Sequence, residues 1–61
     1  MRDWLIACRV KKSLSQKAVS ESVGVSQPTY WAYEHGECTP TPDTAKKIAE
    51  VLDFPWTKFF E

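Results

Sequence analysis

The sequence lacks any apolar run of the roughly 20 residues that a membrane-spanning helix needs, so no such helix is expected. It also lacks a secretory signal, because the apolar stretch from Leu5 to Cys8 is far too short for one. Cysteine is scarce, and Cys8 and Cys38 are expected to be reduced thiols of a cytoplasmic protein. These two cysteines and the one histidine lack the spacing of a metal site, so neither a metal nor a cofactor is expected.

The elements of a catalytic site are absent as well. There is no Gly-rich phosphate loop, and there is no second histidine for a proton relay. A chain of 61 residues has room for one domain, 1–61, and little room for a water-excluding pocket. A domain this small buries only about 60% of its unfolded surface, so association into dimers would help to stabilise it. We therefore expect a binding protein and not an enzyme.

The sequence has no excess of basic residues, since eight Lys and Arg are balanced by eight Asp and Glu. The balance is uneven: residues 1–17 carry five basic residues and one acidic residue, a net charge of +4. Residues 18–61 carry three basic and seven acidic residues, a net charge of −4. A molecule with this asymmetry can present a positive face to nucleic acid, although a short chain can also be asymmetric by chance.

What the sequence does contain is a set of strong helix boundaries. Ser15 and Ser26 are suited to cap helices, and Gly24 lies between them, where a chain most easily takes a positive φ. The pattern predicts a helix-turn-helix with helices over 16–23 and 27–35.

Periodicity and further caps predict helices over 2–12, 42–52 and 55–60. The 42–52 helix begins with a threonine cap and a proline, and carries an apolar stripe of Ala45, Ile48, Ala49 and Leu52. With no strand pattern, the chain is expected to be all-α.

The middle of the chain resembles the helix-turn-helix of the lambda-repressor/Cro-like DNA-binding domains, also called the xenobiotic-response-element family. The residues that carry the resemblance are Leu14-Ser15-Gln16, Val19, Val23-Gly24-Val25-Ser26, Tyr30, Glu34, Gly36 and Pro40. The resemblance implies a compact five-helix domain. It also implies a bacterial or phage regulator of transcription, a repressor, that binds a double-stranded DNA operator at the nucleoid as a homodimer.

In proteins of this family, the outward face of the second motif helix enters the major groove. The base contacts expected here are Gln27, Pro28, Trp31 and Ala32. Gln27 can bond an adenine bidentately, whereas Pro28 and Ala32 offer only apolar contact, for example to a thymine methyl. Trp31 has three interpretations: a DNA contact, a contact to a protein partner, or a residue partly buried against the first helix because the helix phase is off by one position.

Phosphate contacts are expected around this helix. The N-terminus of the 16–23 helix offers free N–H groups, and the resemblance places Gln16 next to the DNA backbone, although Gln16 can also be simply solvated. The candidate phosphate contacts are Gln16, Lys17, Thr29, His35, Thr39 and Lys12. His35 can equally be a solvated residue at a helix end. Relatives usually carry Lys or Arg in the following loop, but here that loop contains Glu37 and no basic residue.

The resemblance also implies two sets of contacts that do not involve bases. An Arg of the first helix pairs with the Glu near the end of the reading helix, here Arg9 and Glu34, although Arg9 can instead reach a phosphate. The dimer contact is expected at the aromatic C-terminal segment, from Phe54, Trp56 and Phe60, although aromatic residues of this segment can also wrap back under the first and fourth helices. Such a dimer sets two reading helices about 34 Å apart, one turn of DNA.

A second function is open on the same fold. The chain can be a protein-interaction module that uses Trp31 and the acidic 36–39 loop to bind a partner. Zero net charge and the loop without cations favour this alternative. Gln16, Gln27 and the basic first third of the chain favour DNA.

Overall fold

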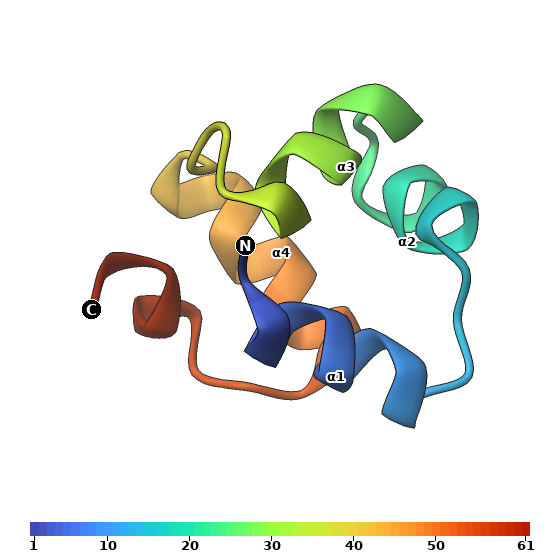
Figure 1. The fold of residues 1–61 in the computed structure, drawn as a ribbon, viewed down its shortest axis with the longest axis horizontal. Coiled ribbons are helices and arrows are strands. Elements are labelled where there is room, and N and C mark those ends of the chain that lie inside the picture. Colours follow the sequence, from blue (N-terminus) through green and yellow to red (C-terminus); the bar gives the residue numbers. More distant parts are fainter.

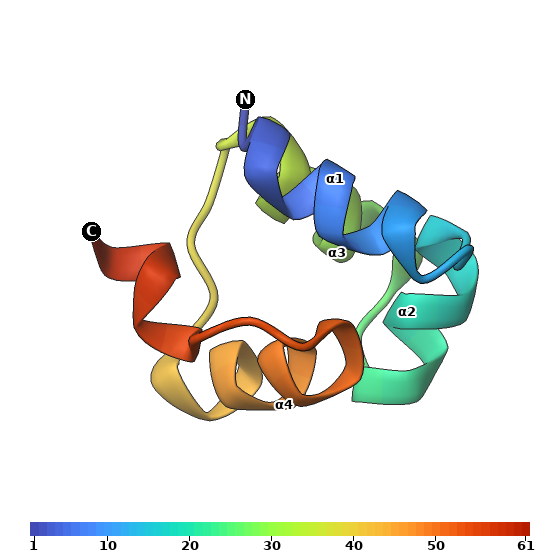
Figure 2. The same ribbon diagram turned by 90° about the horizontal axis from the view of Figure 1, so that it is seen from below.

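The structure, a computed structural model, describes residues 1–61 and contains four α-helices, one 3-10 helix and no strands (Figure 1). The helices are α1 (Asp3–Lys11), α2 (Gln16–Val23), α3 (Gln27–His35) and α4 (Pro42–Leu52), followed by the 3-10 helix η1 (Trp56–Phe60). None of them combines the length and the apolar character that crossing a membrane requires. Figure 2 shows that α1 and α4 lie on opposite sides of the molecule.

The prediction of an all-α chain is confirmed, and the bounds predicted for α2, α3 and α4 are those observed. Two details were wrong. The first helix is one residue shorter at each end than the predicted range 2–12. The fifth element, predicted as a short helix over 55–60, is a 3-10 helix of five residues, Trp56–Phe60. A segment this short forms few hydrogen bonds of its own, and short helical pieces commonly adopt the tighter 3-10 form.

Hydroxyl caps and glycines set most of the helix boundaries. Ser15, Ser26 and Thr41 each accept a hydrogen bond from the backbone N–H three residues further on, at 3.0, 3.3 and 3.4 Å. Gly24 and Gly36 end α2 and α3 with φ of +77° and +76°. A side chain makes this left-handed conformation costly, so glycine is the residue that ends these helices cheaply.

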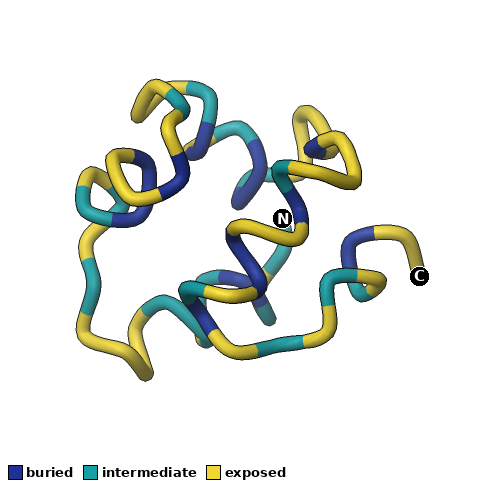
Figure 3. Tube along the Cα trace, turned by 180° about the vertical axis from the view of Figure 1, so that it is seen from behind, coloured by how far each residue is buried: buried dark blue, intermediate teal, exposed yellow.

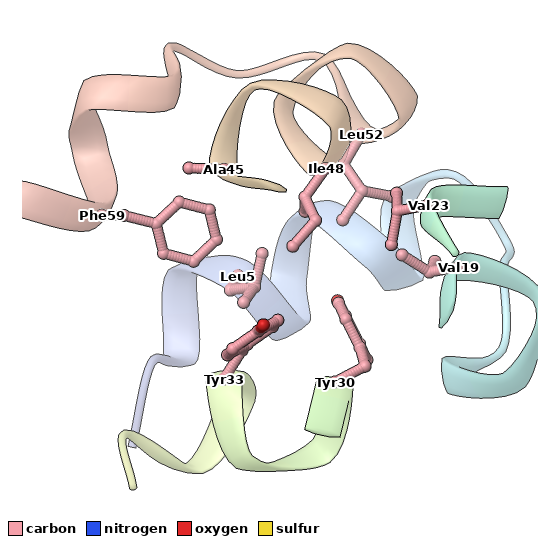
Figure 4. Packing of buried hydrophobic residues seen from close by; sticks show 9 residues of the cluster. All are labelled: Leu5, Val19, Val23, Tyr30, Tyr33, Ala45, Ile48, Leu52 and Phe59. Atoms are coloured by element: carbon pink, nitrogen blue, oxygen red, sulfur yellow. The ribbon is translucent and has the colours of Figure 1, made fainter. Parts of the chain in front are cut away.

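Every element contributes to one core (Figure 4). Its buried members are Leu5, Val19, Val23, Tyr30, Tyr33, Ala45, Ile48, Leu52 and Phe59. Leu5 of α1 lies at the centre, between the two tyrosines of α3 and Ile48 of α4 (Figure 4). Each helix has both buried and exposed positions, as Figure 3 shows, and the apolar stripe predicted for α4 is buried as expected.

The C-terminal segment folds back onto the rest of the chain through aromatic rings. Trp4 of α1 packs edge-on against Phe54 and Phe59, with ring centroids 5.0 and 5.2 Å apart. Phe59 is buried and Phe54 is half-buried, so both belong largely to the fold of a single chain. Trp56 is half-buried beneath Lys46, whereas Phe60 is 49% exposed. Of the three residues expected at a dimer contact, Phe60 presents the most free surface.

Candidate nucleic-acid interface

The helix α3 has one buried face and one exposed face. Tyr30 and Glu34 on its inner face are completely buried, and Tyr33 is 8% exposed. Gln27, Pro28 and Trp31 on its outer face are exposed, and Ala32 is half-buried. In Figure 1, α3 forms the upper edge of the molecule, and its inner face is bonded to α1 through Arg9 and Glu34. The outer face therefore lies at a free edge.

A network of polar side chains fixes the inner face. Arg9 Nε lies 2.6 Å from Glu34 Oε2, and Arg9 Nη2 donates to Oε1 at 3.3 Å. Gln16 Nε2 donates to the same Oε1 at 2.9 Å, and Arg9 Nη1 donates to the carbonyl oxygen of Leu14 at 3.0 Å. Because these contacts join α1, the start of α2 and α3, they hold the motif's two helices in one relative orientation.

The network also determines how its members titrate. Burial by itself raises the pKa of the Glu34 carboxyl, but hydrogen bonds from Arg9 and Gln16 outweigh it, so the pKa lies below its ordinary value. The same carboxylate raises the pKa of the Arg9 guanidinium. Burial, followed by the nearby Glu34 carboxylate, raises the pKa of Tyr30, whose hydroxyl is buried without a hydrogen-bond partner. The pair is therefore charged and Tyr30 is neutral at neutral pH.

The expected base contacts lie together on the outer face. Gln27 makes no side-chain hydrogen bond within the chain, so its amide is free to bond another molecule. Trp31 is 40% exposed and stacks on His35, with ring centroids 3.8 Å apart and planes inclined by 21°. The interpretation of Trp31 as a residue buried against α1 is therefore wrong, because the helix phase is the predicted one.

The candidate phosphate contacts fall on both flanks of α3. Lys12 and Lys17 are exposed near the start of α2, and Gln16 between them keeps one amide N–H free beside its bond to Glu34. Thr29 accepts a hydrogen bond from Ser26 Oγ at 2.7 Å and so keeps its own hydroxyl hydrogen. His35 and Thr39 lie towards the other end of α3, with Thr39 exposed. Arg9, in contrast, is committed to Glu34.

One residue of this region was missed by the sequence analysis. Arg2 precedes α1 but donates from Nη2 to Thr39 Oγ1 at 2.7 Å and from Nη1 to the carbonyl oxygen of Cys38 at 2.9 Å. These partners lie 37 and 36 residues away in the sequence, beyond the reach of any local pattern. No spacing or periodicity could have indicated the contact.

Comparison with known proteins gives one family. A family model described as helix-turn-helix matches residues 5–59. An uncharacterised HTH-type transcriptional regulator of Bacillus subtilis (strain 168), YqaF, is 38% identical over 61 residues, which are all of this chain and 80% of YqaF. The cryptic phage CTXphi transcriptional repressor RstR of Vibrio cholerae is 38% identical over 47 residues, 77% of this chain and 42% of RstR.

A second uncharacterised HTH-type transcriptional regulator of Bacillus subtilis, YqaE, is 37% identical over 46 residues, 75% of this chain and 40% of YqaE. The chain thus spans most of YqaF but about two fifths of RstR and YqaE. No solved structure gives a significant match.

Proposed function

The chain belongs to the Cro/C1-type helix-turn-helix family, and on this premise we propose that it is a sequence-specific repressor that binds a DNA operator. The observation that carries the proposal is the division of α3. Its inner face is tied to α1 and α2 by the Arg9–Glu34 pair, while its outer face offers Gln27 and Trp31 without competing polar partners in the chain. A rigidly held helix with an unengaged outer face is suited to enter the major groove.

The residues of the outer face indicate which base pairs are read. The side-chain amide of Gln27 can donate a hydrogen bond to adenine N7 and accept one from the adenine N6 amino group. Pro28, Trp31 and Ala32 have no such pair of groups and are suited to apolar contact with thymine methyls. The proposed operator therefore has A·T pairs at the positions below the first two turns of α3.

Phosphate contacts on the flank near α2 would set the register of the helix in the groove. Lys12 and Lys17 supply exposed charge, and the first turn of α2 supplies N–H groups and the positive end of the helix dipole, beside Gln16. Thr29 and Thr39, through their hydroxyl groups, and His35, through its imidazole, are further candidates for phosphate contacts. Such contacts position the protein but carry no sequence information.

We propose that the chain is a single domain, 1–61, that acts in the cytoplasm as a homodimer. Phe60 is the most exposed ring of the C-terminal segment, with Trp56 half-buried beside it at a centroid distance of 5.9 Å. Joining two copies there would place two α3 helices on successive major grooves of a palindromic site. Bound in this way, the dimer would exclude RNA polymerase from an overlapping promoter. Sedimentation of Phe60→Ala should show a weakened dimer, and an unchanged dimer would place the interface elsewhere.

The direct test is selection of a binding site from a random duplex library, followed by a salt titration on the enriched sequence. We expect a palindrome with A·T pairs in each half-site, and log K that falls linearly with log salt. A library that yields no enriched sequence, together with no binding at about 50 mM salt, would reject the proposal, because phosphate contacts are strongest at low salt.

A protein-interaction module is the second candidate function. Trp31 stacked on His35 forms an aromatic surface, the exposed acid Glu37 follows His35 by two residues, and aromatic residues are enriched where proteins bind one another. This candidate would take precedence if the library selection failed, and Trp31→Ala would then be the first variant to test against a captured partner.

A further inference from the structure

Arg2 fastens the N-terminal segment to the end of α3. Its backbone N–H donates to the carbonyl oxygen of Glu34 at 2.7 Å, and its Nη1 donates to the carbonyl oxygen of Tyr33 at 2.6 Å. The remaining bonds go to Cys38 O and Thr39 Oγ1, in the loop that follows α3. The guanidinium thus lies at the C-terminal end of α3, where the helix dipole favours a positive charge.

The charge of Arg2 is not cancelled in the folded chain. Its three side-chain acceptors are two carbonyls and one hydroxyl, all of them neutral. A guanidinium has five N–H donors, so two remain free for a further acceptor. Arg9, the other arginine of the chain, differs in this respect, because Glu34 neutralises it in the one ion pair of the structure.

The other basic side chains do not serve this flank. Lys46 and Lys58 lie over the rings of Trp56 and Trp4, as Arg2 lies over the ring of Phe59 at 5.4 Å, but unlike Arg2 neither lysine bonds to the 36–39 loop. Lys47 is an exposed residue of α4. The lysines 11, 12 and 17 belong to the end of α1 and the start of α2. The 36–39 loop itself contains Glu37 and no cation. A helix in the major groove lies between two phosphate backbones, and both require a positive or hydrogen-bonding partner.

We infer that Arg2 contacts a DNA phosphate beside the C-terminal end of α3 and so supplies, from the start of the chain, the positive charge that the 36–39 loop lacks. The inference rests on the proposed DNA-binding function. In the same position Arg2 holds Thr39, a candidate phosphate contact, through the Nη2 bond.

The test is the salt dependence of operator binding for the whole chain. Wild type is compared with Arg2→Gln, which removes the charge, and with Arg2→Lys, which keeps it. Lys47→Gln is the control, because it removes an exposed charge from α4 that makes no ion pair and no side-chain hydrogen bond. Loss of one phosphate contact should reduce the slope of log K against log salt by about 0.9. The affinity loss of Arg2→Gln should then be about 3.5-fold larger at 50 mM than at 200 mM salt.

Arg2→Lys and Lys47→Gln should keep the wild-type slope. If Arg2 only supported the fold and contacted no phosphate, Arg2→Gln would keep the wild-type slope even if it bound the operator more weakly. That result would overturn the inference. A wild-type chain that binds no duplex at any salt would instead reject the proposed function itself.

A second measurement needs no variant. Phenylglyoxal modifies arginine, and mass spectrometry can follow Arg2 and Arg9 separately because they are the only two arginines. Bound operator should protect Arg2 and leave the modification of Arg9, which is paired with Glu34 and 16% exposed, unchanged. Equal modification of Arg2 with and without operator would contradict the phosphate contact, even if Arg2→Gln failed to fold.

Discussion

The two faces of α3 differ in what determines their residues. On the inner face, Tyr30 and Glu34 are completely buried, and Glu34 accepts hydrogen bonds from two other elements. On the outer face, Gln27 has no side-chain partner and Trp31 contacts its own helix neighbour His35. The fold constrains the inner face closely and leaves the outer face largely unconstrained.

This difference separates the residues that determine stability from those proposed to determine DNA specificity. A change on the inner face should alter the free energy of unfolding, and a change on the outer face should alter the choice of DNA sequence.

The largest effect should come from Arg9→Met. It leaves the Glu34 carboxylate, only 1% exposed, without its cationic partner, and breaking a buried pair in this way costs about 3–5 kcal/mol. A chain of 61 residues has a free energy of unfolding of about 3–9 kcal/mol, so the variant should lose a third or more of its stability. Urea denaturation followed by circular dichroism measures the loss. The control Lys11→Met removes an exposed charge from the same helix and should cost less than about 0.5 kcal/mol.

A smaller loss should accompany acidification. The folded state holds the pKa of Glu34 below its ordinary value of 4.5, so the unfolded chain binds the proton first as the pH falls. The stabilisation is complete above about pH 5 and is lost as the pH falls through 4.5 towards the folded-state pKa. The loss is smaller than in Arg9→Met because a protonated carboxyl still accepts hydrogen bonds.

Thermal unfolding between pH 3 and pH 7 measures this dependence. Glu34→Gln should flatten the curve below about pH 5, whereas Glu37→Gln, at an exposed position, should leave it nearly unchanged. An acid-induced loss of equal size in Glu34→Gln would show that other carboxyls are responsible.

Local signals made the motif predictable. Ser15, Ser26, Gly24 and Gly36 determine the ends of α2 and α3 through bonds to residues only a few positions away. Helical periodicity then assigns the inner and outer faces, since Glu34 and Tyr30 lie one turn apart. For these elements the sequence pattern and the structure agree, because each boundary is decided within one turn of helix.

The contacts between distant segments were not predictable in the same way. Trp4 packs on Phe54 and Phe59, and Arg2 bonds to Thr39, across more than thirty residues. Gln16 was expected to be free for phosphate, but half of its donor capacity is used on Glu34. Such pairings depend on how the helices pack, which neither periodicity nor capping specifies.

On the outer face, Gln27→Ala should change specificity and not stability. The wild-type chain should prefer the operator over a duplex in which that A·T pair is replaced. Loss of the bidentate contact to adenine should reduce this preference by about 1–3 kcal/mol. The free energy of unfolding should change by less than about 0.5 kcal/mol, because no side-chain bond within the chain is lost. Competition binding with the two duplexes gives the measurement. Equal weakening on both duplexes would show that Gln27 contacts the backbone and not a base.

The smallest effect should come from an inner-face change, Tyr30→Phe. The ring fills the core, but its hydroxyl oxygen is buried without a hydrogen-bond partner, so removing that oxygen relieves a desolvation cost. Stability should be unchanged or raised by up to about 1 kcal/mol, whereas Tyr30→Ala, which removes the ring, should cost about 3 kcal/mol or more. A loss of more than about 1 kcal/mol in Tyr30→Phe would mean that the hydroxyl donates to the Glu34 carboxylate in solution. Tyr30 would then be a fourth member of the network that orients α3, and its side chain would stabilise the inner face through a polar contact as well as through packing.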